Sequence, residues 1–231
     1  FLDCFGCDVD YSLGKNFADF ADQFSKDSRY RTELYKLRRK FMSHADGLIH
    51  ADLHTSNIMA SRDKMKVIDM EFAFMGPFGY DLGYLVGNLI SQYCAACFKR
   101  FPSEQSRKQF KAYLLATIKL LIETYMKTFT LCWEKSVKER YRGQQGLLQS
   151  ILQEVMEDVP GYASMVNWFR SVSEIPYPDF DIIEDKDAKR NATVLSLMID
   201  WGIMFGRYKY QSADDLIETI IGIEEEFRKS L

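Results

Sequence analysis

The sequence predicts a mainly α-helical fold that is interrupted by one small β-hairpin. Apolar residues recur at helical spacing along most of the 231 residues. Two short runs of strand-forming residues, 58–60 and 66–68, flank the polar, turn-forming stretch 61–64. Glycine and proline at 76–79 then separate this hairpin from a second helical region. We therefore expect a helical lead-in over 1–47 and one compact domain over 48–231, with the hairpin region at 48–81 and a helical remainder at 82–231.

The lead-in is predicted to hold two helices. Its apolar side chains recur at helical spacing in two groups: Phe17, Phe20, Ala21 and Phe24, then Leu34, Leu37 and Phe41. Asp27 and Ser28 lie between the groups and are residue types that cap helices. Gly47 ends the second helix, and the short apolar run 48–49 leads directly into a polar stretch.

Helices dominate the rest of the chain. One is predicted to start at Asp81 and reach about Phe98, and a longer one follows Pro102 and reaches about Lys135. Later helices are expected at 147–157, 162–172, 187–205 and 213–229. Ser212 and Asp215 resemble a capping box at the start of the last one. The acidic, proline-containing stretch 175–187 is the clearest loop.

Composition excludes several classes of protein. The net charge of −3 and the lack of a basic run give no reason to expect nucleic-acid binding. No apolar run approaches the roughly 20 residues that cross a bilayer, so no membrane span is expected. The odd number of cysteines, five, argues against a disulfide framework and predicts the cytoplasm or another reducing intracellular compartment. Cys94 and Cys97 lie in an apolar helical run and are predicted to be small core residues rather than zinc ligands.

The hairpin region carries the polar residues that suggest chemistry. Phosphoryl transfer from a nucleotide needs a carboxylate that accepts the proton of the attacking hydroxyl. It also needs magnesium, which takes hard oxygen ligands and offsets phosphate charge. Asp52 lies on the loop before the first strand, and Asn57 is five residues after Asp52. Asp69 comes just after the second strand. Neighbouring strands lie about 5 Å apart, so the hairpin can bring Asn57 and Asp69 toward one ion.

These motifs resemble those of a kinase family. The Asp-x-x-x-x-Asn spacing followed by a strand-borne Asp is typical of kinase catalytic and metal-binding loops. Two segments resemble motifs of the 5-methylthioribose kinases. The first is His50-Ala-Asp-Leu-His-Thr, and the second is the thirteen residues from Asp69-Met-Glu-Phe-Ala-Phe to Gly-Tyr-Asp81. That family is part of the wider group of aminoglycoside and choline kinases. The close resemblance runs from about residue 48 to 89.

The resemblance implies a role for each matching residue. Asp52 would be the catalytic base, and Asn57 and Asp69 would hold Mg²⁺ and, through it, ATP. Glu71 would be a further metal ligand, and His50 would brace the loop through backbone hydrogen bonds. Asp81 would cap its helix and steady the catalytic loop.

Simpler interpretations exist for several of these residues. Asn57 alone fits a turn residue, and Asp81 alone fits an N-cap. His54 fits a polar loop residue. Phe72 and Phe74 fit core packing better than a nucleotide platform.

The chain departs from the family pattern in three places. Ala51 replaces the glycine of the family's His-Gly-Asp, and a Cβ there restricts the backbone. The family's late pair of adjacent arginines is represented only by Arg207, in a region without a secure alignment. Upstream of His50 there is neither a glycine-rich loop nor a strand lysine, and the chain starts at Phe1. We therefore expect a processed or partial product: a protein-kinase-like C-terminal lobe whose N-terminal ATP lobe is missing.

Two functions from different classes follow. The resemblance implies ATP- and Mg²⁺-dependent phosphorylation of a small-molecule hydroxyl, 5-methylthioribose in the first place. A related kinase acting on choline or an aminoglycoside ranks lower, because Glu71-Phe72-Ala73-Phe74 points to the thioribose group. The alternative is a truncated, catalytically inactive domain that serves as a structural subunit of a larger assembly. A protein partner would then cover the apolar surface where the missing lobe would sit.

Overall fold

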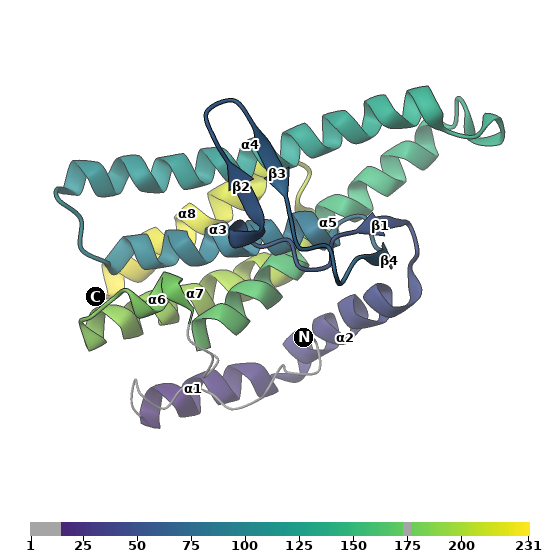
Figure 1. Cartoon of the computed structure of the whole chain (residues 1–231). Coiled ribbons are helices and arrows are strands. Elements are labelled where there is room, and N and C mark those ends of the chain that lie inside the picture. Colours follow the sequence, from purple (N-terminus) through teal and green to yellow (C-terminus); the bar gives the residue numbers. More distant parts are fainter. Residues whose placement is uncertain (1–14, 173–176) are drawn as a thin grey trace.

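The computed structural model describes residues 15–172 and 177–231, and this part of the chain is mainly helical, as predicted (Figure 1). The lead-in holds α1 (Lys15–Lys26) and α2 (Ser28–Ser43). Asp27 caps α2, as expected, by accepting hydrogen bonds from the backbone N–H groups of Arg29 and Tyr30. The later helices are α3 (Tyr80–Phe98), α4 (Glu104–Ser136), α5 (Gln145–Val172), α6 (Pro178–Asp181), α7 (Lys186–Gly206) and α8 (Ala213–Ser230). The capping box of Ser212 and Asp215 is present at the start of α8.

Two antiparallel strand pairs lie between α2 and α3. The predicted hairpin is formed by β2 (Ile58–Ala60) and β3 (Met65–Val67), one residue earlier in its second strand than expected. The other pair joins β1 (Gly47–Ile49) to β4 (Phe74–Gly76), with Gly47 opposite Gly76. This pair was not predicted, because a pairing between distant segments leaves no local signal. It closes residues 50–73 into a loop whose two ends lie side by side.

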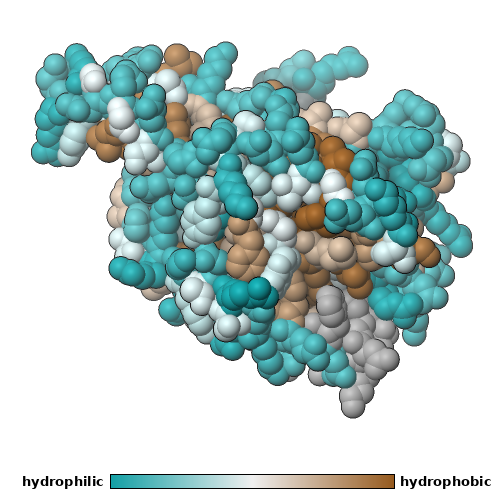
Figure 2. All heavy atoms as spheres, turned by 180° about the vertical axis from the view of Figure 1, so that it is seen from behind, coloured by the Kyte–Doolittle hydropathy of each residue, from teal (hydrophilic) through white to brown (hydrophobic). Residues whose placement is uncertain are grey.

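The core is built around α3. Nearly every side chain of this helix is buried, and the helix packs against α4, α5 and α7. Gly83 and Gly87 allow α5 to come close, because a Cβ on Gly87 would lie 2.6 Å from the backbone oxygen of Ala163. Seen from behind (Figure 2), polar residues cover most of the surface and apolar side chains gather in the middle of that face.

Three local predictions need correction. Residues 147–157 and 162–172 belong to one helix, α5, which continues through Pro160. Proline costs one backbone hydrogen bond, but α5 is buried on both sides of Pro160, and that packing keeps the helix continuous. The stretch expected as a loop contains the single helical turn α6. Phe72 is 59% exposed and therefore does not pack in the core, whereas Phe74 packs against Phe41.

The remaining predictions concern the cysteines and the membrane. Cys94 and Cys97 are free, buried residues of the core, as predicted. A second pair of cysteines at the same spacing, Cys4 and Cys7, lies outside the described residues. In the two described ranges, no helix combines the length and the apolar content that a membrane crossing requires.

A buried carboxylate connects α8 to α3 and α4. Glu224 accepts hydrogen bonds from Tyr93 on α3 and Lys111 on α4, and from Arg228 one turn further along α8. Burial raises the pKa of Glu224, but the hydrogen bonds from Lys111, Tyr93 and Arg228 outweigh burial and lower the pKa to about 2. The ionised carboxylate therefore stabilises the folded state.

The backbone has left-handed conformations at the two ends of the loop that β1 and β4 close. Ala51 has φ +68° and Asp69 has φ +65°, and they are the non-glycine residues with positive φ in the described part of the chain. Asp tolerates this region because its short polar side chain can bond locally, whereas Ala does not. The conformation explains why a glycine suits position 51.

The lowered pKa of Glu224 predicts that the folded protein loses stability in acid. A glutamate that titrates normally near pH 4.5 but near pH 2 in the folded protein contributes stability above pH 4.5 and loses it as pH falls toward 2. We expect this group to contribute on the order of 3 kcal/mol. Chemical denaturation from pH 6 to about pH 2 should show a steeper loss for the wild type than for Glu224→Gln. Glu226→Gln, on an exposed side chain of the same helix, is the control, and parallel curves for wild type and Glu224→Gln would contradict the assignment.

The left-handed backbone conformation of Ala51 predicts that glycine at this position stabilises the protein. Ala51→Gly should raise the free energy of unfolding by about 1 kcal/mol, because glycine adopts positive φ without a steric penalty. Ala60→Gly is the matched control: Ala60 is exposed in β2 and is not among the positive-φ residues, so this change should be destabilising. Thermal denaturation of both variants provides the measurement, and a loss of stability in Ala51→Gly would argue against strain at this position.

Candidate active site

The polar motifs meet beside the start of α3. Residues 50–57 leave β1, and residues 68–73 connect β3 to β4, so the β1–β4 pair brings both segments to one place. In Figure 1 the β1–β4 pair is drawn beside α2, which it contacts through β4, and the β2–β3 hairpin is drawn in front of α3. The site is therefore placed by strand pairing and by the first turns of a buried helix.

Asp81 holds the loop backbone. Its two carboxylate oxygens accept hydrogen bonds from the backbone N–H groups of His50, at 2.6 Å, and Ala51, at 2.9 Å. The expected N-cap is not formed: α3 begins after Gly79, and no side chain caps it. Asp81 is the second residue of α3, and its carboxylate points to the two loop N–H groups. Burial raises the pKa of Asp81, and the two backbone hydrogen bonds partly offset that increase.

His50 links the two motifs. Its Nε2 lies 2.8 Å from the carbonyl oxygen of Ile68, which is an acceptor, and its Nδ1 lies 3.3 Å from the backbone N–H of Asp52, which is a donor. These partners fit the neutral imidazole with its proton on Nε2. The ring is buried. His50 therefore ties the residue before Asp69 to the loop that carries Asp52.

Asp52 presents a half-buried carboxylate. Its side chain is 27% exposed. Its Oδ1 accepts a hydrogen bond from the hydroxyl of Tyr84 at 3.1 Å, and its Oδ2 lies 3.4 Å from Nε2 of His54. The backbone oxygen of Asp52 accepts a hydrogen bond from Nδ2 of Asn57 at 3.0 Å. Asp52 is thus oriented by contacts on its backbone and on both carboxylate oxygens.

Asn57 is buried and spans the loop. It ends the 3₁₀ turn Thr55–Asn57, so it is a turn residue, but its side chain also reaches back to Asp52. Because Nδ2 is used in that bond, Oδ1 is the amide atom left for a ligand. The backbone oxygen of Asn57 accepts the N–H of Ile68 at 3.0 Å. This bond continues the hairpin and places Asn57 beside the residue before Asp69.

Asp69 and Glu71 lie at the open edge of the site. Both are exposed, and within residues 15–172 and 177–231 no hydrogen bond joins either of them to Asp52 or Asn57. The same ranges contain no group of three or more His, Cys, Asp or Glu side chains arranged to hold a metal ion. The structure therefore joins His50, Asp52, Asn57 and Asp81 into one frame and leaves the other two carboxylates free at its edge.

The candidate ligand atoms are of the chemical type that magnesium prefers. Magnesium in nucleotide sites is usually held by one or two carboxylates, with phosphate oxygens and water completing the octahedron. Asp69, Glu71 and Oδ1 of Asn57 offer hard oxygen atoms of this kind, without the nitrogen or sulfur ligands that zinc prefers. A complete cage of protein ligands is not needed for such an ion.

The structure also shows what sequence reasoning missed. Tyr84 contacts the Asp52 carboxylate, but nothing in the motif marks it; its position three residues after Asp81 on one helix face becomes informative only when the loop is placed. His54, expected as a plain loop residue, lies beside the same carboxylate. Arg207 is buried and paired with Glu33 at 3.0 Å, so it contributes to the core rather than to an open site.

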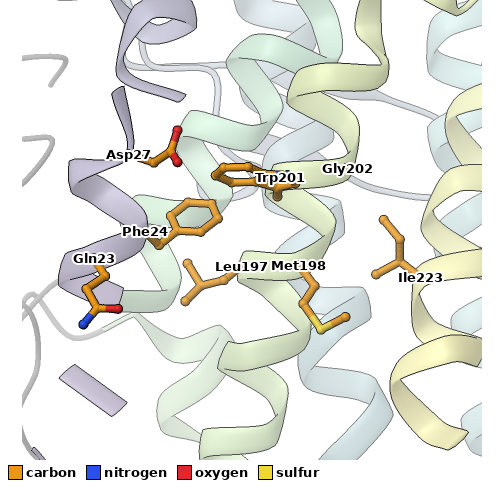
Figure 3. A pocket seen from close by; sticks show the side chains of 8 residues that line it. All are labelled: Gln23, Phe24, Asp27, Leu197, Met198, Trp201, Gly202 and Ile223. Atoms are coloured by element: carbon orange, nitrogen blue, oxygen red, sulfur yellow. The ribbon is translucent and has the colours of Figure 1, made fainter. Parts of the chain in front are cut away.

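A separate cavity lies between α1, α7 and α8 (Figure 3). It has a volume of about 600 Å³, and Figure 3 shows Phe24 and Trp201 facing each other at one end while Ile223 approaches from α8. Other lining residues include Leu197 and Met198. None of them comes from residues 48–81, so this cavity is not part of the polar site.

Comparison with known proteins agrees with the motifs. Residues 10–119 match the model of the phosphotransferase enzyme family. A methylthioribose kinase of Geobacillus thermodenitrificans is 32% identical over 198 residues, which are 86% of this chain and 48% of that protein. Methylthioribose kinase 2 of Oryza sativa subsp. japonica is 31% identical over 203 residues, covering 83% of this chain and 47% of the rice protein. The chain spans about half the length of the curated relatives that it matches.

The match to the phosphotransferase family includes the whole site, from His50 to Asp81. The similarity to methylthioribose kinases extends well beyond it, over more than four fifths of the chain. The chain is therefore a methylthioribose kinase-like protein.

Proposed function

We propose that this chain carries the catalytic loop of an ATP- and Mg²⁺-dependent kinase that phosphorylates a small-molecule hydroxyl, and that its substrate is 5-methylthioribose. The observation that carries the proposal is the partly exposed Asp52 carboxylate, which is contacted by Tyr84 and His54 while Asn57 holds the backbone oxygen of the same residue. The substrate is proposed from the names of the relatives, which are methylthioribose kinases from bacteria and rice.

Asp52 acts as the base in this scheme. The substrate hydroxyl attacks the γ-phosphorus of ATP, its proton passes to a carboxylate oxygen of Asp52, and the bond between the γ-phosphorus and the ADP oxygen breaks. The frame of His50, Asn57 and Asp81 keeps the loop fixed, so that orientation of the hydroxyl costs little at the moment of reaction. The products are ADP and a phosphorylated small molecule.

Asp69, Glu71 and the amide oxygen of Asn57 are the groups that we propose hold magnesium. The ion supplies charge neutralisation on the phosphate oxygens when it is bound. Exposure of both carboxylates suits this role, because the remaining ligands come from nucleotide and water. Asp69 is held by its left-handed backbone conformation and by the hydrogen bonds of its neighbour Ile68 to His50 and Asn57.

An ATP-binding lobe would rest on the strands. Apolar side chains are exposed along the hairpin and the segment that follows it, among them Met59, Met65, Val67, Met70 and Phe72. Exposed apolar patches mark surfaces that another part of a protein covers. We propose that this surface contacts an ATP-binding lobe and that the adenine site is shared with that lobe.

The alternative of an inactive structural subunit has less support. A structural role accounts for the buried His50 and the partly buried Asp81. It does not account for the partly exposed carboxylate of Asp52, which accepts a hydrogen bond from Tyr84 on Oδ1 and has His54 beside Oδ2. The relatives are named as kinases. The enzymatic function is therefore the one that we test.

Removing the base should abolish catalysis. Asp52→Asn should lower kcat for phosphoryl transfer from ATP to 5-methylthioribose by roughly 10³-fold, because proton acceptance and orientation are lost together. The assay uses the polypeptide as its gene encodes it, with formation of the phosphorylated sugar followed by mass spectrometry. Asp63→Asn, in the exposed turn of the hairpin, is the control. Turnover by Asp52→Asn close to that of the wild type would remove Asp52 from its proposed role.

Removing a metal ligand should abolish binding of the magnesium–nucleotide complex. Titration calorimetry of the same polypeptide with Mg-ADP should give a binding heat that is lost in Asp69→Ala and retained in Asp63→Ala. Omission of magnesium should weaken nucleotide binding to the wild type and leave Asp69→Ala unchanged, because that variant no longer holds the ion. Equal magnesium dependence in both proteins would show that Asp69 is not a ligand.

A further inference from the structure

We infer that Tyr84 is a positioning residue for Asp52: its hydroxyl fixes one carboxylate oxygen and leaves the other to receive the substrate proton. The inference rests on the proposed role of Asp52 as the base. It is carried by the hydrogen bond from the Tyr84 hydroxyl to Oδ1 of Asp52, at 3.1 Å, between two residues that lie on different elements.

The position of Tyr84 on α3 explains how it reaches Asp52. Asp81 and Tyr84 are three residues apart and therefore share a face of the helix. Asp81 binds the backbone of His50 and Ala51, and Tyr84 binds the side chain of the next residue, Asp52. One turn of α3 thus contacts three consecutive loop residues, and only the last of these contacts is to a side chain that can react.

The phenol ring is held firmly. Tyr84 is 8% exposed, and its ring lies 6.0 Å from that of Tyr80, centroid to centroid. Its backbone oxygen accepts a hydrogen bond from Nδ2 of Asn88 at 3.0 Å, inside a helix whose other face packs against α5 and α7. A donor on so rigid an element can orient a loop side chain, whereas a donor on a mobile loop would move with it.

The hydroxyl remains a donor at every working pH. Burial of the ring, and then the charge of Asp52, raise the pKa of Tyr84 far above its ordinary value. The group is therefore neutral and protonated, and it can only donate to a carboxylate that has no proton of its own.

A fixed Oδ1 distinguishes the two oxygens of Asp52. Rotation of an aspartate carboxyl about its last torsion is broad and roughly two-fold, so an unsupported carboxylate does not define which oxygen faces the substrate. With Oδ1 bound to Tyr84, Oδ2 is the oxygen on the side of His54, where Nε2 lies 3.4 Å away. Oδ2 is then the proton acceptor, and it is presented in one orientation.

Kinetics of Tyr84→Phe test the inference, because this change removes the hydroxyl and keeps the ring. We expect kcat to fall by roughly 10-fold while KM for both substrates changes little, since the lost contact orients the base rather than binding substrate. Tyr80→Phe is the matched control: it removes a second buried phenol one turn earlier on the same helix, and it should keep the wild-type kcat. In an Asp52→Asn background, Tyr84→Phe should cause no further loss, because the two residues act as one unit.

The outcomes separate this inference from the proposed function. Suppose that the wild type transfers phosphate. Tyr84 does not act through Asp52 if Tyr84→Phe has the wild-type kcat, or if Tyr84→Phe lowers kcat by the same factor in the Asp52→Asn background as in the wild type. If the wild type shows no transfer at all, the proposed function fails, and the contact is tested by NMR of carboxyl-¹³C-labelled aspartate. The Asp52 signal, identified by its loss in Asp52→Asn, should shift in Tyr84→Phe and stay in place in Tyr80→Phe. An unmoved signal in Tyr84→Phe would overturn the inference by itself.

Discussion

Two hydrogen bonds from the backbone of His50 and Ala51 to the carboxylate of Asp81 hold the whole site together. They attach the loop that follows β1 to α3, whose side chains are nearly all buried. The charge-assisted bonds use both carboxylate oxygens, and bonds of this type are about twice as strong as neutral ones. They also hold Ala51 in a left-handed conformation that alanine does not favour. The position of Asp52 follows from this anchor.

The anchor is effective because α3 cannot move independently. Gly83 and Gly87 let the helix backbone approach α5 closely, and a side chain at either position would clash with backbone oxygens. The residues that contact the loop, Asp81 and Tyr84, share the same helix as these glycines. Tight packing therefore sets the geometry of the polar site, while the two exposed carboxylates, Asp69 and Glu71, remain accessible at its edge.

The sequence predicted the features that local pattern determines. Helical periodicity located the helices, Asp27 and Ser212 marked two helix starts, and the turn residues between 60 and 65 indicated the β2–β3 hairpin. It did not predict the β1–β4 pair, because Gly47 and Gly76 meet only through tertiary structure. It placed a break near Pro160, where burial on both sides of the residue outweighs a missing hydrogen bond. The site followed the same division: the motif spacing indicated Asp52, Asn57 and Asp69, whereas Tyr84 belongs to no motif and is found only from its contact.

The central claim is that α3 anchors the loop that carries Asp52, and amide hydrogen exchange of the wild-type protein tests it most directly. Protection of an amide reports how rarely its hydrogen bond opens. The account predicts that the N–H groups of His50 and Ala51, although they belong to no helix or strand, exchange as slowly as those paired between β1 and β4. Exchange at the rate of Asp63, in the exposed turn of the hairpin, would contradict it.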